Sequence, residues 1–84
     1  MLKELASKYI QKTERVFKEV KIHSGLATIN EKEILDVVET AKRYFEDAKY
    51  YQGKEKLETS LVAVAYCEGL LDALRFLRII EFTW

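Results

Sequence analysis

The 84-residue sequence contains no proline, three glycines, one cysteine and one histidine. A lone cysteine cannot close a disulfide within the chain. Because Cys67 and His23 lie far apart in the sequence, they do not form a set of metal ligands either. Cys67 also falls on an apolar helical arc with no histidine beside it, so we interpret it as a small core residue. We therefore predict no metal site, no cofactor and no catalytic nucleophile.

The sequence also lacks an excess of charge of either sign. Fourteen basic and fourteen acidic residues give a formal net charge of zero, which argues against a nucleic-acid partner or an anionic membrane surface. No apolar run approaches the roughly 18 residues that span a bilayer. The amphipathic N-terminus does not resemble a signal peptide. We expect a cytoplasmic protein, by elimination.

The few residues that interrupt helices, three glycines and no proline, divide the chain into three helical segments. Residues 2–21 carry apolar side chains at three- and four-residue steps over an arc of roughly 140°, which predicts a surface helix with one buried face. After a break around Gly25, Asn30 and Glu33 have the spacing of an N-cap residue and its N3 partner. They predict that a second helix spans residues 31–52, with a similar apolar stripe.

Gly53 predicts the end of the second helix, and the short link after it forces the next helix to run back antiparallel. A single continuous helix through Gly53 is the alternative, because one glycine costs only about 1 kcal/mol inside a helix. The third helix is predicted over residues 55–80. Its apolar residues cover an arc of roughly 240°, so it needs neighbours on more than one side.

These segments predict an all-α fold, a small antiparallel three-helix bundle formed by a single domain over residues 1–84. The third helix lies in the middle and forms a tight hairpin with the second. The tail over residues 79–84 is apolar and must fold back on the bundle or meet another chain. The wide arc and the tail favour a homo-oligomer, most simply a dimer. Its predicted interface residues are Leu70, Leu74, Leu77, Ile80, Phe82 and Trp84.

The polar residues on or beside apolar faces form the candidate ligand site: Asp47, Glu68 and Asp72, with Tyr44 and Tyr66. Two helices could bring these carboxylates together as an acid/base pair or a cation site. The alternative is structural: the carboxylates accept hydrogen bonds from tyrosine hydroxyls or pair with Arg75, which lies three residues after Asp72. Gly69, in the middle of a helix, is explained by the close approach of another backbone or ring, or by a ligand contact.

Two motifs carry a family resemblance. Residues 41–51 read A-x-x-Y-x-x-D-A-x-x-Y and residues 61–74 read L-V-A-x-x-Y-x-E-G-x-L-D-A-L. Over residues 34–80 the chain resembles the archaeal family called domain of unknown function 357. The resemblance implies a small all-helical domain with no established activity and no catalytic residues to transfer. It also implies an accessory role beside nucleotidyltransferase-like domains. The chain departs from the pattern at Arg78, where a glycine is expected, and in its short turn at Gly53.

Two functional hypotheses follow. The first is an interaction or oligomerisation module with no enzymatic activity of its own, which self-associates or binds a protein partner. The second is an accessory domain that binds a small ligand, such as a nucleotide, between its helices or serves a nucleotidyltransferase-type partner.

Overall fold

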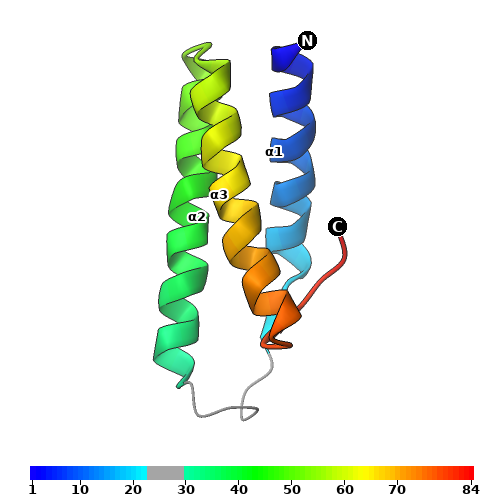
Figure 1. Ribbon diagram of the computed structural model, residues 1–84, viewed down its shortest axis with the longest axis vertical. Coiled ribbons are helices and arrows are strands. Elements are labelled where there is room, and N and C mark those ends of the chain that lie inside the picture. The colour runs from blue at the N-terminus through cyan, green and yellow to red at the C-terminus, as the bar shows by residue number, and fades with distance from the viewer. Residues whose placement is uncertain (23–29) are drawn as a thin grey trace.

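Three helices dominate the computed structural model, which describes residues 1–22 and 30–84 (Figure 1). They are α1 (Leu2–Glu19), α2 (Glu31–Gly53) and α3 (Leu57–Phe76). Two short strands, β1 (Lys21–Ile22) and β2 (Ile80–Glu81), complete the described elements. The all-α prediction is confirmed. The predicted break at Gly25 and the lone His23 lie outside the described residues.

The start of α2 follows the predicted cap. The side chain of Asn30 accepts a hydrogen bond of 2.8 Å from the backbone N–H of Glu33. The Asn30 amide in turn donates to the Glu33 carboxylate at 3.3 Å. This reciprocal pair satisfies a backbone donor that the first turn of a helix leaves without a partner.

The turn between α2 and α3 reverses the chain within three residues. Glu55 has a φ of 60°, its N–H donates to the Gln52 carbonyl, and the Lys56 N–H donates to the Tyr51 carbonyl. These are the two hydrogen bonds of a Schellman motif, with Glu55 in the left-handed position that glycine usually occupies. The alternative of one continuous helix through Gly53 is wrong.

Small residues bring α2 and α3 close together. Ala41 and Ala48 of α2 are fully buried, and Ala63 of α3 is buried as well. The buried Ser60 hydroxyl donates a 2.7 Å hydrogen bond to the Ala48 carbonyl. This bond links the two helices and satisfies a polar group that would otherwise be costly to bury.

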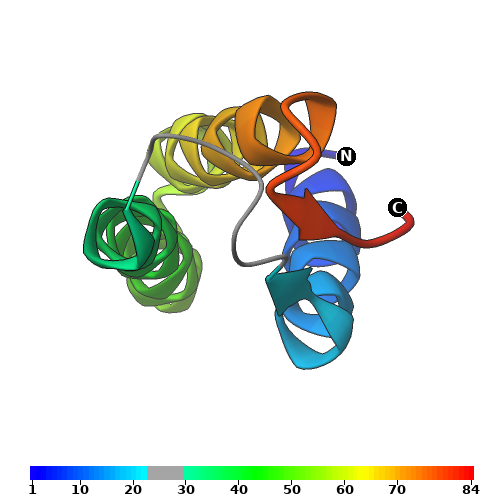
Figure 2. The same cartoon turned by 90° about the horizontal axis from the view of Figure 1, so that it is seen from below.

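Helix α3 is the central element, as predicted. Figure 2 shows α1 and α2 on the same side of α3, so no helix of the described residues lies against the other side of α3. The inner side of α3 is buried and consists of Ser60, Ala63, Val64, Cys67, Leu71 and Leu74. We call these six residues the inner face. None of the helices in the described chain is long and apolar enough to cross a membrane.

Helix α3 ends at Phe76, four residues before the predicted Ile80. A second Schellman motif ends it: Arg78 has a φ of 61°, and the Ile79 N–H donates to the Leu74 carbonyl at 2.9 Å. Arg78 thus occupies the left-handed position where the family resemblance leads us to expect glycine.

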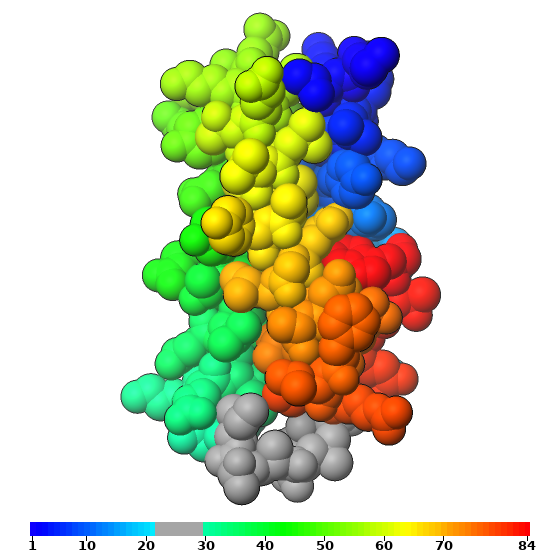
Figure 3. All heavy atoms as spheres, in the orientation of Figure 1, coloured from blue at the N-terminus to red at the C-terminus, as the bar shows by residue number. Residues whose placement is uncertain are grey.

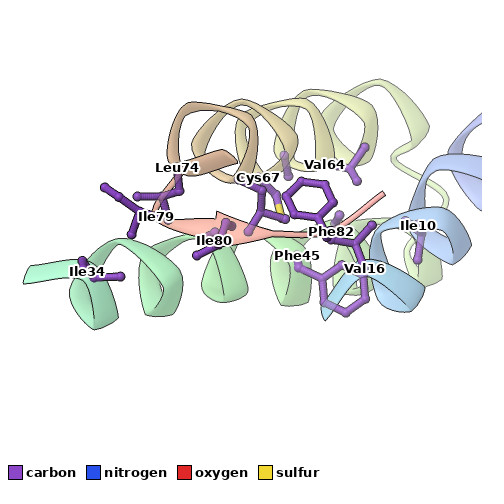
Figure 4. Close-up of a cluster of buried hydrophobic side chains, with 14 residues drawn as sticks. Ile10, Val16, Ile34, Phe45, Val64, Cys67, Leu74, Ile79, Ile80 and Phe82 are labelled. Atoms are coloured by element: carbon purple, nitrogen blue, oxygen red, sulfur yellow. The ribbon is translucent and has the colours of Figure 1, made fainter. Parts of the chain in front are cut away.

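The tail then folds back on the bundle. Strand β2 pairs antiparallel with β1, with Lys21 opposite Glu81. This two-residue ladder was not predicted, and α1 ends at Glu19 rather than at residue 21. Ile79, Ile80 and Phe82 are buried in the core (Figure 4). The tail therefore covers part of the core between α1 and α3 and does not need a second chain to shield it.

Candidate interaction surface

The predicted acidic residues take separate positions. Asp47 is exposed on α2. Glu68 on α3 faces α1, where Lys12 Nζ lies 3.3 Å from its Oε1. That oxygen is buried and accepts no hydrogen bond, so the ion pair with Lys12 offsets the cost of burying its charge. Within the described chain, no group of three or more His, Cys, Asp or Glu side chains could hold a metal ion.

Asp72 anchors the tail. Its Oδ1 accepts a 2.7 Å hydrogen bond from the Trp84 indole and lies 3.2 Å from the Arg75 guanidinium. The pairing of Asp72 with Arg75, predicted as the structural alternative, is confirmed. The contact with Trp84 was not predicted, because it depends on the chain reversing after α3.

Basic side chains of α1 hold the tail from the other side. Arg15 donates to the Thr83 carbonyl at 3.1 Å and also to the Trp84 carbonyl. Lys12 Nζ lies 5.0 Å from the centre of the Trp84 ring, within cation–π range. Two of the three predicted carboxylates, Glu68 and Asp72, thus belong to one structural network that joins α1, α3 and the tail.

Tyr44 and Tyr66 stack on each other instead of meeting the carboxylates. Their ring centres are 5.3 Å apart and their planes differ by 16°. Tyr44 is half-buried on α2, whereas Tyr66 remains exposed on α3. The pair marks the edge where the α2–α3 contact meets solvent.

Cys67 lies on the inner face and is fully buried. Burial, together with the charge of Glu68, raises the pKa of its thiol to about 12. At neutral pH the thiol is protonated and shielded, as in an inert core cysteine. This agrees with the prediction that Cys67 is a small core residue.

The predicted interface residues divide into three groups. Leu74, Ile80 and Phe82 are buried in this chain's own core. Leu70 and Trp84 are half-buried. Leu77, at the C-cap of α3, is exposed. The predicted interface included residues of the tail, because the sequence could not show that the tail folds back to cover the core.

The exposed apolar surface lies instead along the solvent side of α3. Its large side chains are 57–71% exposed, and the small residues between them are exposed as well. We call this set the outer face of α3: Val62, Ala65, Tyr66, Gly69, Ala73, Phe76 and Leu77. None of the seven is charged. Val62 and Phe76 were not among the predicted interface residues. Both belonged to the apolar arc of the predicted third helix, but helical periodicity could not show that they face solvent.

The outer face has a shallow hollow near its centre. Ala65, Tyr66, Gly69 and Leu70 line a space of about 340 Å³. In Figure 3, α3 runs down the middle of the viewed face, in yellow and orange, with no other element covering it. The hollow exists because small residues lie between larger ones, and its lining is apolar.

A larger hollow, of about 680 Å³, runs along α1 and is lined by polar and charged residues. Its basic residues include Lys3 and Lys8, which are exposed, and Lys12 and Arg15, which already contact the tail. Because half of these cations are engaged within the chain, this hollow is a weaker candidate for binding than the outer face.

The fold and surface thus define a small helical protein with an apolar outer face and carboxylates that pair within the chain. A family model confirms the resemblance seen in the sequence. It matches residues 8–80, and the chain belongs to the family described as "Protein of unknown function (DUF357)". The matched segment includes the whole outer face. Searches of curated proteins and of solved structures found no match.

Proposed function

We propose that this protein is an interaction module that self-associates through the outer face of α3. The observation that carries the proposal is the row of exposed, uncharged side chains along α3, on the side opposite to the one that packs against α1 and α2. Single exposed apolar residues are normal on a protein surface, whereas a continuous patch marks an interaction site.

The size of the patch supports this proposal. An aromatic side chain carries roughly 150–250 Å². Tyr66 is 60% exposed and Phe76 is 71% exposed, so the two rings alone expose roughly 200–300 Å². Val62 and Leu77 are each more than half exposed. The outer face therefore exposes several hundred Å² of apolar surface, a patch size that is often functional, and a pair of copies buries it twice.

A second copy of this chain suits the face because charge does not oppose it. The net charge is zero, so two copies do not repel each other at long range. The uncharged face also offers no ion pairs to an acidic or basic partner. The outer face is therefore best matched by another apolar surface. A second copy of this chain provides one, without another protein.

A matched pair of variants tests the proposal. Tyr66 on the outer face and Tyr50 on α2 are both 60% exposed. Tyr66→Glu introduces a charge into the proposed interface, and Tyr50→Glu introduces the same charge elsewhere. Sedimentation velocity at tens of micromolar should show dimers for the unmodified chain and for Tyr50→Glu, and monomers for Tyr66→Glu. Circular dichroism checks that both variants remain helical.

Two results would contradict self-association. One is a monomeric unmodified chain throughout this concentration range. The other is a dimer that persists in Tyr66→Glu, which would place the interface elsewhere on the molecule.

A small ligand between the helices, such as a nucleotide, has less support. Glu68 pairs with Lys12, and Asp72 pairs with Arg75 and Trp84. A ligand would have to displace these partners, and their loss would leave charges poorly compensated.

A further inference from the structure

Four residues of the outer face lie in symmetric positions about Gly69. Val62 and Phe76 lie seven residues before and after it, and Ala65 and Ala73 lie four residues before and after it. Steps of four and seven residues return to nearly the same side of a helix. The solvent side of α3 therefore presents a large residue, a small one, glycine, a small one and a large one in line.

The described residues of this chain do not explain Gly69. A Cβ atom built at this position meets nothing within 4 Å among residues 1–22 and 30–84, so neither a backbone nor a ring of these residues requires glycine there. Glycine in the middle of a helix is unfavourable compared with alanine. The close approach of a backbone from outside the chain would account for it, as small residues do where two helices touch.

We infer that two copies pack α3 against α3 in antiparallel orientation, with the two-fold axis at Gly69. This inference rests on the proposed self-association. In an antiparallel pair, Val62 of one copy meets Phe76 of the second copy, and Ala65 meets Ala73. The same patch then serves both sides, as a two-fold interface requires.

The antiparallel orientation is favoured over the parallel one by side-chain size. A parallel pair places Phe76 against Phe76 at one end and Val62 against Val62 at the other, so the two ends need different helix separations. An antiparallel pair places one valine against one phenylalanine at both ends. The helices then keep one separation along their contact and meet most closely at Gly69.

Charge at the two ends of the face favours the same orientation. Glu58, exposed in the first turn of α3, lies on the line of the outer face, and Arg78 is exposed just past its end. Antiparallel copies bring Glu58 of each near Arg78 of the other. Parallel copies bring like charges together.

A distance between spin labels distinguishes the two orientations. The label is attached to Thr59→Cys, an exposed position in the first turn of α3, in a Cys67→Ala background. At 1.5 Å per residue, antiparallel copies crossing at Gly69 hold the two labels about 30 Å apart, whereas parallel copies hold them roughly 10 Å apart. Pulsed electron double resonance measures this separation. A distance near 30 Å supports the inference.

A short distance in a dimeric sample overturns the antiparallel orientation and leaves self-association standing. A monomeric sample, shown by sedimentation of the same labelled protein, overturns both. Sedimentation of the Cys67→Ala chain, and of the unlabelled chain that carries both substitutions, checks that neither substitution causes that loss.

A second pair of variants tests the close approach at Gly69. Gly69→Leu should weaken dimerisation at least tenfold, because the added side chain separates the helices at their closest point. The control, Gln11→Leu, adds the same side chain at an exposed position on α1 and should leave dimerisation unchanged. Equal dimerisation in the two variants would overturn the placement of the axis at Gly69.

Discussion

The inner and outer faces of α3 are both apolar, yet they have opposite surroundings. The five apolar residues of the inner face are 0–8% exposed, whereas the four large residues of the outer face are 57–71% exposed. Helices α1 and α2 and the tail cover only one of these faces. The folding of a single chain therefore accounts for the apolar residues of the inner face, and we propose that self-association accounts for those of the outer face. Four predictions of stability test this division.

The largest effect is expected from truncating the same residue type on opposite sides of the helix. Leu71→Ala, at a fully buried position, should lower the free energy of unfolding by about 2–5 kcal/mol because it leaves a cavity. Leu77→Ala, at a position 64% exposed, should change it by about 0.5 kcal/mol or less. Urea unfolding of dilute, monomeric protein measures both. Similar losses would contradict the division.

The inner face should also make stability fall at alkaline pH. The Cys67 thiol has a pKa of about 12 in the folded chain, against an ordinary value of 9.0, mainly because of burial. Between these values the unfolded chain releases the proton and the folded chain keeps it. The free energy of unfolding should therefore fall, by at most about 1.4 kcal/mol per pH unit, as pH rises from about 9 towards 12.

The Cys67→Ala chain is the control for this prediction, since its other groups titrate as in the unmodified protein. The difference between the two unfolding free energies should be constant below about pH 8 and should change above pH 9. A difference that stays constant through pH 11 would show that the thiol is not shielded.

A smaller loss is expected at the hydrogen bond that joins α2 to α3. Ser60→Ala removes the donor to the Ala48 carbonyl and should cost about 1 kcal/mol. Thr59→Ala, at the exposed neighbouring position, should cost about 0.5 kcal/mol or less. Thermal unfolding of the two variants gives the comparison. An unchanged midpoint for Ser60→Ala would show that the bond contributes nothing net.

The smallest effect is a gain. Gly69→Ala should raise the free energy of unfolding of the monomer by about 0.5–1 kcal/mol, because alanine favours the helix and its Cβ meets nothing. Urea unfolding at low concentration measures the gain. A loss of stability would mean that Gly69 serves the single chain, against the role we assign to it.

The helices could be predicted from the sequence because their determinants are local. The cap formed by Asn30 and Glu33 and the turn after Gly53 act within a few residues. The end of α3 was harder, because Arg78 adopts a left-handed conformation that glycine usually signals. The resemblance to the family indicated a departure at this position but not its conformation.

The candidate surface could be predicted only in part, because its limits depend on contacts between distant segments. The 240° apolar arc contained both faces of α3, and helical periodicity does not say which part of such an arc is covered. The sequence assigned Phe82 and Ile80 to an interface. Their burial depends on the tail folding back, and the tail folds back through a two-residue ladder with β1 that the sequence did not predict. The Asp72–Trp84 contact depends on the same return.

The most direct test of self-association through the outer face is a dilution series followed by NMR. Between about 300 µM and about 5 µM, a range that spans the dissociation of a dimer formed at tens of micromolar, two surfaces of the same chain can be compared. Self-association predicts that the signals of Tyr66, Gly69 and Ala73 shift with concentration, whereas those of Tyr50 on α2 do not. Signals from the outer face that stay constant throughout, or shifts confined to other surfaces, would contradict it.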